Sequence, residues 1–186
     1  MTYTRPVTAT VRALHRSSDY AFSKEACASL DLIAGIGVAG DVHAGATVRH
    51  RSRVERDPSQ PNLRQVHLFD GELLDMLASE GFDLSAGLLG ENVTTMGLDA
   101  LSLPTGTLLR IGPDALLALT GVRNPCAQID ERFPGLLKRM VHRDDDGELV
   151  RLTGAMAVVV QAGRIHEGDH ISVQLPPGTP QPLPLV

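Results

Sequence analysis

Short apolar segments separated by turn residues make up most of this chain, and this pattern predicts a mainly β protein. Turns are expected at Pro104-Thr105-Gly106, Gly112-Pro113-Asp114 and Glu167-Gly168-Asp169. Many short strands at such a spacing favour a barrel or a sandwich. The expected strands cover residues 7–14, 63–69, 91–95, 107–111, 115–122, 155–161 and 170–175.

Helical patterns are few and short. The clearest one starts at Asp70, which can serve as an N-cap, and ends near Gly81, which stands where a C-terminal cap belongs. Its apolar stripe consists of Leu73, Leu74 and Leu77. A second short helix is expected within residues 130–141, interrupted by Pro134-Gly135. The fold class is therefore mainly β (α+β), with a few short helices.

Three segments follow no regular pattern. Residues 32–46 carry glycine at four positions and predict short extended pieces and turns. Residues 49–62 are polar and charged, with two prolines, and predict a mobile loop. Five prolines within residues 176–186 argue against strand pairing there. We therefore expect one domain over residues 1–175 and a disordered, proline-rich tail over residues 176–186.

The composition fits one small globular domain. The chain has 186 residues, of which 42% are apolar, and no apolar run approaches the ~18 residues of a membrane helix. The N-terminus shows no signal-peptide pattern, which predicts a cytoplasmic protein. A net charge of −5 and an aromatic content of 3% argue against binding to nucleic acid or to membranes.

Two cysteines, Cys27 and Cys126, lie far apart in the sequence, so neither a zinc ribbon nor a disulfide framework fits. Pro125 is expected to stop the strand over residues 115–122, which puts Cys126 at a strand end with Arg123 nearby. A thiolate in that position is a soft ligand that suits a soft metal centre. The alternative is a buried cysteine that acts as a small hydrophobic residue.

Two further motifs place polar side chains on shared faces of an extended backbone. Asn92 and Thr94 point the same way in a strand and can hydrogen-bond a pterin or a phosphate. The alternative is a turn that leads into an edge strand. Asp41 and His43 also share a face and can form a carboxylate–imidazole pair for proton transfer. In the alternative, Asp41 accepts hydrogen bonds from turn amides.

One basic cluster stands out in this acidic chain, and it consists of Arg49, His50, Arg51, Arg53 and Arg56. It can bind an anion such as a cofactor phosphate. Alternatively it is a solvated loop that neighbouring acidic residues partly neutralise. The motifs GxxxxGK[ST], HExxH and GxSxG are absent, so a P-loop, a zincin and an α/β-hydrolase elbow are unsupported.

Taken together, these segments resemble the MOSC domain, named after the C-terminal domain of molybdenum cofactor sulfurases. The resemblance covers residues 5–175, and its most specific part is the Gly-Glu-Asn-Val-Thr-Thr segment followed by Pro125-Cys126. The similar segments, in order, are residues 40–45, 64–68, 87–95, 103–112, 123–126, 154–163 and 168–171.

The resemblance implies a MOSC-type β-barrel and a molybdenum cofactor of the molybdopterin type, with Cys126 as the molybdenum ligand. It also implies roles for other residues. The candidates for holding the pterin and its phosphate are Arg49, Asn92, Thr94 and Arg123, and the candidates for relaying a proton are Asp41 and His43. Sulfurase relatives use pyridoxal phosphate in a separate domain, for which this chain is too short, so that cofactor is not expected here.

Three functions stay open. An enzyme would reduce N-hydroxylated substrates at a molybdenum held by Cys126, as amidoxime-reducing relatives do. A carrier would hold sulfur as a persulfide on Cys126 or deliver the cofactor to another protein. A scaffold would have kept the fold and lost the ligand. The implied partners are a small-molecule cofactor and a redox partner or a sulfurase, and an oligomer is compatible with the sequence.

Overall fold

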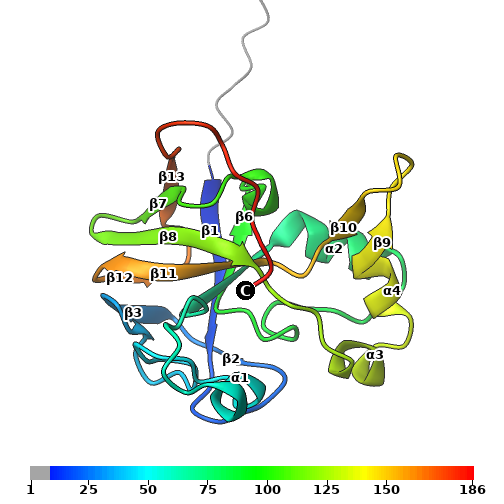
Figure 1. Ribbon diagram of the computed structural model, residues 1–186, viewed down its shortest axis with the longest axis horizontal. Coiled ribbons are helices and arrows are strands. Elements are labelled where there is room, and N and C mark those ends of the chain that lie inside the picture. Colours follow the sequence, from blue (N-terminus) through cyan, green and yellow to red (C-terminus); the bar gives the residue numbers. More distant parts are fainter. Residues whose placement is uncertain (1–8) are drawn as a thin grey trace, which may run out of the picture.

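A closed barrel of seven strands forms the centre of the protein (Figure 1). The computed structural model describes residues 9–186, apart from the side chain of Ser52. The strand order is β13–β7–β8–β11–β5–β6–β1, and β1 pairs back to β13. The barrel strands are β1 (Ala9–Arg16), β5 (Val66–Asp70), β6 (Val93–Met96), β7 (Leu108–Ile111), β8 (Ala115–Val122), β11 (Ala155–Gln161) and β13 (His170–Gln174). This architecture confirms the mainly β class and the barrel expected from the sequence.

Side-chain alternation fills the barrel interior. Along β8, Ala115, Leu117 and Leu119 are buried, while the residues between them are partly exposed. Successive side chains of a strand point to opposite faces, so the buried set lines the inside. Val11 and Leu68 join it from the other side of the barrel in one continuous core. Removal of this apolar surface from water is the main source of stability.

A second apolar core lies on one side of the barrel, under the helices to the right in Figure 1. It includes Phe69, Leu77, Ile129 and Leu136, which are fully buried. The helix α2 belongs to the connection between β5 and β6, which run parallel and therefore need a crossover. The elements of this side are α2 (Gly71–Ser79), α3 (Gln128–Arg132), α4 (Leu136–Met140), β9 (Val141–Arg143) and β10 (Leu149–Arg151).

The helix expected after the strand over residues 63–69 is α2. Asp70 precedes it, but its carboxylate accepts a 3.3 Å hydrogen bond from the Thr95 hydroxyl and does not cap the helix. Gly81 follows with a φ of 99°, in the left-handed region that favours glycine. The interrupted helix expected within residues 130–141 is the pair α3 and α4.

Small elements complete the fold around the barrel. They are β2 (Glu25–Ala26), β3 (Ser29–Ile33), β4 (Gly37–Val38), β12 (Gly163–His166) and the 3-10 turn η1 (Ala100–Ser102). The expected strand over residues 7–14 begins outside the described residues and continues as β1. No helix within residues 9–186 combines the length and the apolar character needed to cross a bilayer.

The segment over residues 49–62 differs from the expected mobile loop, because it contains the helix α1 (Arg51–Arg56). Asn62 fastens the segment to the preceding turn, since its amide donates to the carbonyl oxygens of His43 and Gly45 at 2.9 and 3.0 Å. These bonds join residues distant in sequence, so the local polar pattern did not reveal them.

The tail over residues 176–186 also differs from the expected disorder, because it packs along the end of β8 (Figure 1). The Val122 amide donates to the carbonyl oxygen of Pro184 at 2.7 Å, and the Val186 amide donates back to Val122 at 3.2 Å. A proline lacks an N–H but keeps its carbonyl acceptor, so alternate residues of this tail still pair.

Candidate functional site

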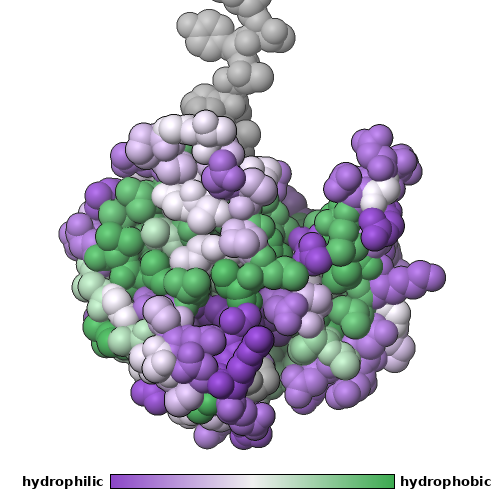
Figure 2. All heavy atoms as spheres, viewed as in Figure 1, coloured by the Kyte–Doolittle hydropathy of each residue, from purple (hydrophilic) through white to green (hydrophobic). Residues whose placement is uncertain are grey.

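A cavity of about 470 Å³ is lined mainly by the loops that follow β1 and β8 and by the segments that precede β5 and β6. Its charged lining is almost wholly basic, because Glu55 is the one acidic residue among the described residues that line it. The basic residues of the lining are Lys24, Arg49, Arg51, Arg53, Arg64 and Arg123. Figure 2 shows hydrophilic residues gathered over α1, between an apolar area over β8 and another over α4. The cavity therefore favours an anionic ligand.

Cys126 lies on this cavity wall, four residues after the end of β8 and two before α3 begins. Its thiol is free and half-buried, and its Sγ lies 3.8 Å from the side-chain oxygen of Gln128. Cys27, in contrast, packs against the barrel core away from this wall, and burial raises the pKa of its thiol. Of the two cysteines, only Cys126 can meet a ligand in the cavity.

The guanidinium charges of Arg123 and Arg64 both interact with the charge of a Cys126 thiolate. Burial lowers the pKa of the Arg123 guanidinium, and the negative charge of a Cys126 thiolate opposes that effect. Arg123 donates a 2.6 Å hydrogen bond to the carbonyl oxygen of Leu89, which fixes it against the segment before β6. Burial, together with Arg123 and Arg53, lowers the pKa of Arg64 to about 10, again opposed by Cys126.

Arg64 is a site residue that the sequence interpretation missed. Its backbone amide donates to the side chain of Asn62 at 3.1 Å, which orients the start of β5. Within residues 9–186 no hydrogen bond or ion pair of its guanidinium is formed, although the side chain is largely buried. A buried cation without a partner is costly unless an anion pairs with it. The signals for it in the sequence were a basic residue near the start of the strand expected over residues 63–69 and its place in the MOSC-like segment over residues 64–68.

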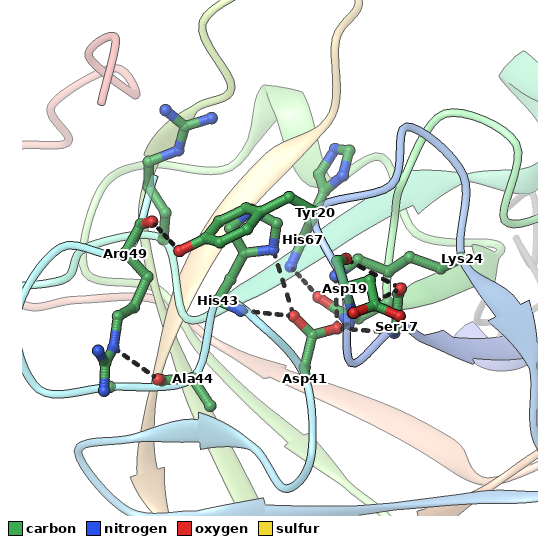
Figure 3. A network of polar contacts seen from close by, with 12 residues as sticks. Ser17, Asp19, Tyr20, Lys24, Asp41, His43, Ala44, Arg49 and His67 are labelled. Atoms are coloured by element: carbon green, nitrogen blue, oxygen red, sulfur yellow. Dashed lines mark hydrogen bonds and ion pairs between the residues drawn. The ribbon is translucent and has the colours of Figure 1, made fainter. Parts of the chain in front are cut away.

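Asp41, the first of the two expected proton-relay residues, binds several donors at once (Figure 3). Its Oδ1 accepts from the His43 amide at 2.9 Å and lies 3.3 Å from His43 Nδ1. Its Oδ2 accepts from Lys24 Nζ at 2.7 Å and from the Asn92 amide at 2.9 Å. Burial alone would raise the pKa of Asp41, but the bonds from His43 and Lys24 hold it far below its usual range. Both alternatives expected for Asp41, the imidazole pair and the turn bonds, are therefore present together.

Asn92 lines the cavity, but its hydrogen bonds are mostly used within the protein. Besides Asp41, its amide donates to the carbonyl oxygen of His15 at 3.1 Å, and its Oδ1 accepts from the His67 amide at 3.2 Å. It therefore shapes the wall by joining β1, β5 and the segment before β6.

The structure does not bring Thr94 to the cavity wall. Asn92 precedes β6, which starts at Val93, and lines the cavity, whereas Thr94 lies within β6 and does not line it. The Thr94 hydroxyl is fully buried and donates to Glu91 at 3.2 Å. Thr94 therefore supports the fold behind the site.

The basic cluster divides between the cavity and solvent. Arg49, Arg51 and Arg53 line the cavity, whereas Arg56 does not. The Arg49 backbone carbonyl accepts a 2.7 Å bond from the Tyr20 hydroxyl, and the Arg51 guanidinium lies 4.8 Å from the Tyr20 ring centroid. Tyr20 thus links the loop after β1 to α1 across the mouth (Figure 3).

The donor set of the cavity suits a metal–pterin group better than a bare metal ion. Among the described residues, no group of three His, Cys, Asp or Glu side chains can hold a metal ion by itself. One soft thiol beside several cations fits a metal that arrives with its own sulfur ligands and an anionic phosphate. The residues present therefore fit a molybdopterin-type cofactor.

Comparison with known proteins decides the family. The model of the MOSC domain matches residues 39–172. The chain belongs to the MOSC domain family. This MOSC chain is 29% identical over 143 residues to a protein named "Reductase" from Gibberella moniliformis, a match that covers 74% of the chain and 22% of that relative. The chain thus spans about a fifth of the relative's length.

Solved structures show the same fold. The YuaD protein from Bacillus subtilis is 25% identical and superposes with a TM-score of 0.69, covering 89% of this MOSC chain and 95% of its own. YiiM from Escherichia coli is 18% identical, with a TM-score of 0.62 over 95% of this chain and 74% of its own. The second likeness shows the fold alone.

Proposed function

We propose that this MOSC protein binds a molybdenum cofactor of the molybdopterin type in the basic cavity, with Cys126 as the protein's ligand to molybdenum. The observation that carries the proposal is the placement of Cys126 on a cavity wall whose charged side chains are almost all cationic. A dithiolene and a phosphate ester bring negative charges that such a wall stabilises.

Arg123 and Arg64 pair with the cofactor phosphate in this proposal, and Arg49 binds it from the mouth of the cavity. Asn92 keeps the wall in shape, and Thr94 acts from behind it. The bound cofactor supplies two electrons, which suits the reduction of an N-hydroxylated substrate. His43, held by Asp41, donates a proton to the substrate. The reductase name of the fungal relative supports this reaction class, and we place the protein in the cytoplasm.

A carrier function is the second candidate, because the same free thiol beside Arg64 and Arg123 also suits a persulfide. Sulfur that cyanide releases from Cys126, without turnover of any N-hydroxylated substrate, would favour the carrier. That reaction removes one sulfur atom per thiol and leaves the fold unchanged.

The test measures molybdenum and pterin in protein made in a host with sufficient molybdate. We expect about one molybdenum per chain in the wild type and in Cys27→Ser, and almost none in Cys126→Ser. Cys27→Ser is the matched control, because Cys27 lies away from the cavity. Molybdenum-free wild type from a replete host, or equal molybdenum in both variants, would overturn the proposal.

A further inference from the structure

The two carboxylate oxygens of Asp41 contact two different nitrogen-containing side chains, those of Lys24 and His43. Oδ2 pairs with Lys24 Nζ at 2.7 Å, and Oδ1 lies 3.3 Å from His43 Nδ1. A carboxylate can only accept, so Nδ1 of His43 carries the hydrogen and Nε2 is the nitrogen left for other partners. Figure 3 shows His43 and Lys24 on different sides of the carboxylate.

Lys24 lines the cavity, and its ammonium group has N–H donors beyond the one that binds Asp41. An ammonium has three hydrogens, and within the described chain Lys24 Nζ makes one hydrogen bond, to Asp41. The Lys24 side chain is 5% exposed and Asp41 is 2% exposed, so bulk water does not surround this pair. Lys24 also lines the cavity, and its remaining donors are therefore available to a ligand there.

The electrostatic surroundings favour release of a proton from Lys24. Burial lowers the pKa of its ammonium, Asp41 opposes this shift, and the charge of Arg123 adds to it. Asp41 stays ionised throughout, because its pKa is held far below the usual range. The carboxylate thus holds the two acids in place and does not itself carry a proton.

We propose that Lys24 and His43 are the two proton donors of the reductive reaction, each held on its own oxygen of a permanently ionised Asp41. This inference rests on the proposed function, and it adds Lys24 to the site as a catalytic residue. It also separates the roles of the pair expected from the sequence, since His43 donates and Asp41 positions.

Reduction of an N-hydroxylated substrate consumes two protons, which matches the two proton donors at Asp41. Reduction of an N-hydroxylated amine or amidine breaks the N–O bond with two electrons, which the reduced cofactor provides. The departing hydroxyl takes one proton and leaves as water, and the nitrogen takes the second proton. Lys24 then holds a neutral amine and His43 a neutral imidazole, and water entering the cavity protonates both again. His43 is 29% exposed, which gives it access to that water.

Other charged and polar groups face this pair. The Tyr20 ring meets the His43 ring edge-on at 5.8 Å, and the His50 ring stacks on it at 6.4 Å. Behind Lys24, charge interactions reach Glu91 and Arg123. The further cations of the wall are Arg49, Arg53 and Arg64. All of them are present in each variant proposed below, so a change in proton transfer is assigned to Lys24 itself.

The decisive variant is Lys24→Arg, compared with Lys24→Met and with Lys138→Met on the exposed face of α4. Arginine keeps the charge and can keep the bond to Asp41, but a guanidinium does not release a proton near neutral pH. We expect Lys24→Arg to keep its molybdenum and its KM for benzamidoxime, and to lose about 100-fold in kcat with reduced methyl viologen as electron donor. Lys24→Met should lose at least as much, and Lys138→Met nothing.

A second measurement does not depend on the loaded enzyme. The chain has two lysines, Lys24 and Lys138, so cofactor-free protein labelled at lysine Cε gives two NMR signals, which Lys138→Arg assigns. We expect the Lys24 signal to titrate below the ordinary lysine range and to move in Asp41→Asn. This holds even if Lys24→Arg fails to fold.

These measurements distinguish a failure of the Lys24 role from a failure of the reductase function. Wild-type kcat in Lys24→Arg, or a Lys24 signal that titrates in the ordinary lysine range, would overturn this inference while leaving the proposed function standing. A wild type that holds molybdenum but reduces no N-hydroxylated compound would overturn the reductase function, and the role of Lys24 with it.

Discussion

The guanidinium of Arg123 donates a 2.6 Å hydrogen bond to the carbonyl oxygen of Leu89, and Arg123 lines the same cavity as Cys126. This bond joins the loop after β8 to the segment before β6. The bond to Leu89 fixes the orientation of the buried Arg123 guanidinium in the cavity wall. A rigid cation of this kind binds an anion with little loss of side-chain freedom.

Replacing Arg123 tests its role toward the cofactor. We expect Arg123→Gln to weaken retention of the pterin phosphate by about tenfold or more, because one charge-assisted hydrogen bond contributes roughly 1.5–3 kcal/mol. Pterin released from purified protein measures the effect. Arg110→Gln is the control, since Arg110 is exposed on β7 far from the cavity. Equal pterin in the two variants contradicts the assignment.

Replacing Asn92 tests its structural role. Asn92→Leu leaves the His67 amide and the His15 carbonyl without their side-chain partner, and each buried unsatisfied group costs about 1–3 kcal/mol. We expect a loss of roughly 2–4 kcal/mol in the free energy of unfolding, measured in urea. Asn124→Leu, at an exposed position of the same cavity, should change stability by less than about 0.5 kcal/mol. A comparable loss in both variants would show that Asn92 has no special role.

Asp70 makes the stability depend on pH. Burial raises the pKa of its carboxyl to about 6, above its value of 3.8 in the unfolded chain. The folded protein therefore holds this proton more tightly, so the contribution is fully present below pH 4 and is lost as pH rises through 6. We expect Asp70→Asn to be more stable than the wild type at pH 7, with the difference vanishing near pH 4. Urea unfolding at both pH values measures it, and a difference that stays constant with pH would contradict the shift.

Removing the tail tests its packing. A chain that stops at Gly178 loses the bonds between Val122 and residues Pro184 and Val186, and it uncovers the buried Val122. The truncation also removes the bonds that Thr105 donates to the carbonyl oxygens of Gln181 and Pro182, so four hydrogen bonds and some apolar burial are lost. We expect a loss of about 3–5 kcal/mol in the free energy of unfolding. Leu185→Ala, which changes an exposed side chain of the same tail, serves as control and should cost little. Unchanged stability after truncation would restore the view of a disordered tail.

Much of the barrel could be predicted from local patterns. The apolar segments 115–122 and 155–161 coincide with β8 and β11, because a strand buried on one or both faces leaves a strong signal in its own residues. Cys126 could be placed at a strand end because Pro125 interrupts the pattern. Asp41 and His43 could be paired because they are two residues apart.

The rest depended on contacts that the sequence does not display. Lys24 and Arg64 reach the cavity from loops whose course is set by distant partners such as Asp41 and Asn62. The helix α1 has a polar sequence, and local periodicity cannot reveal that Arg51 and Arg53 line the cavity while Arg56 does not. The sequence did not show that the buried Thr94 hydroxyl bonds Glu91 and lies away from the cavity lining.

The barrel strands pair over unequal lengths, so some parts of the barrel should open more readily than others. Among residues 9–186, two residue pairs link β1 to β13, at Ala9–Ile171 and Thr10–His170, whereas β8 and β11 share a long ladder. Transient opening should therefore begin at this seam, and its amides should exchange with deuterium soonest among the barrel strands. The seam lies at the start of β1 and Lys24 follows its far end, roughly 20 Å along the strand at 3.3 Å per residue. The barrel can loosen there without disturbing the groups that hold a ligand.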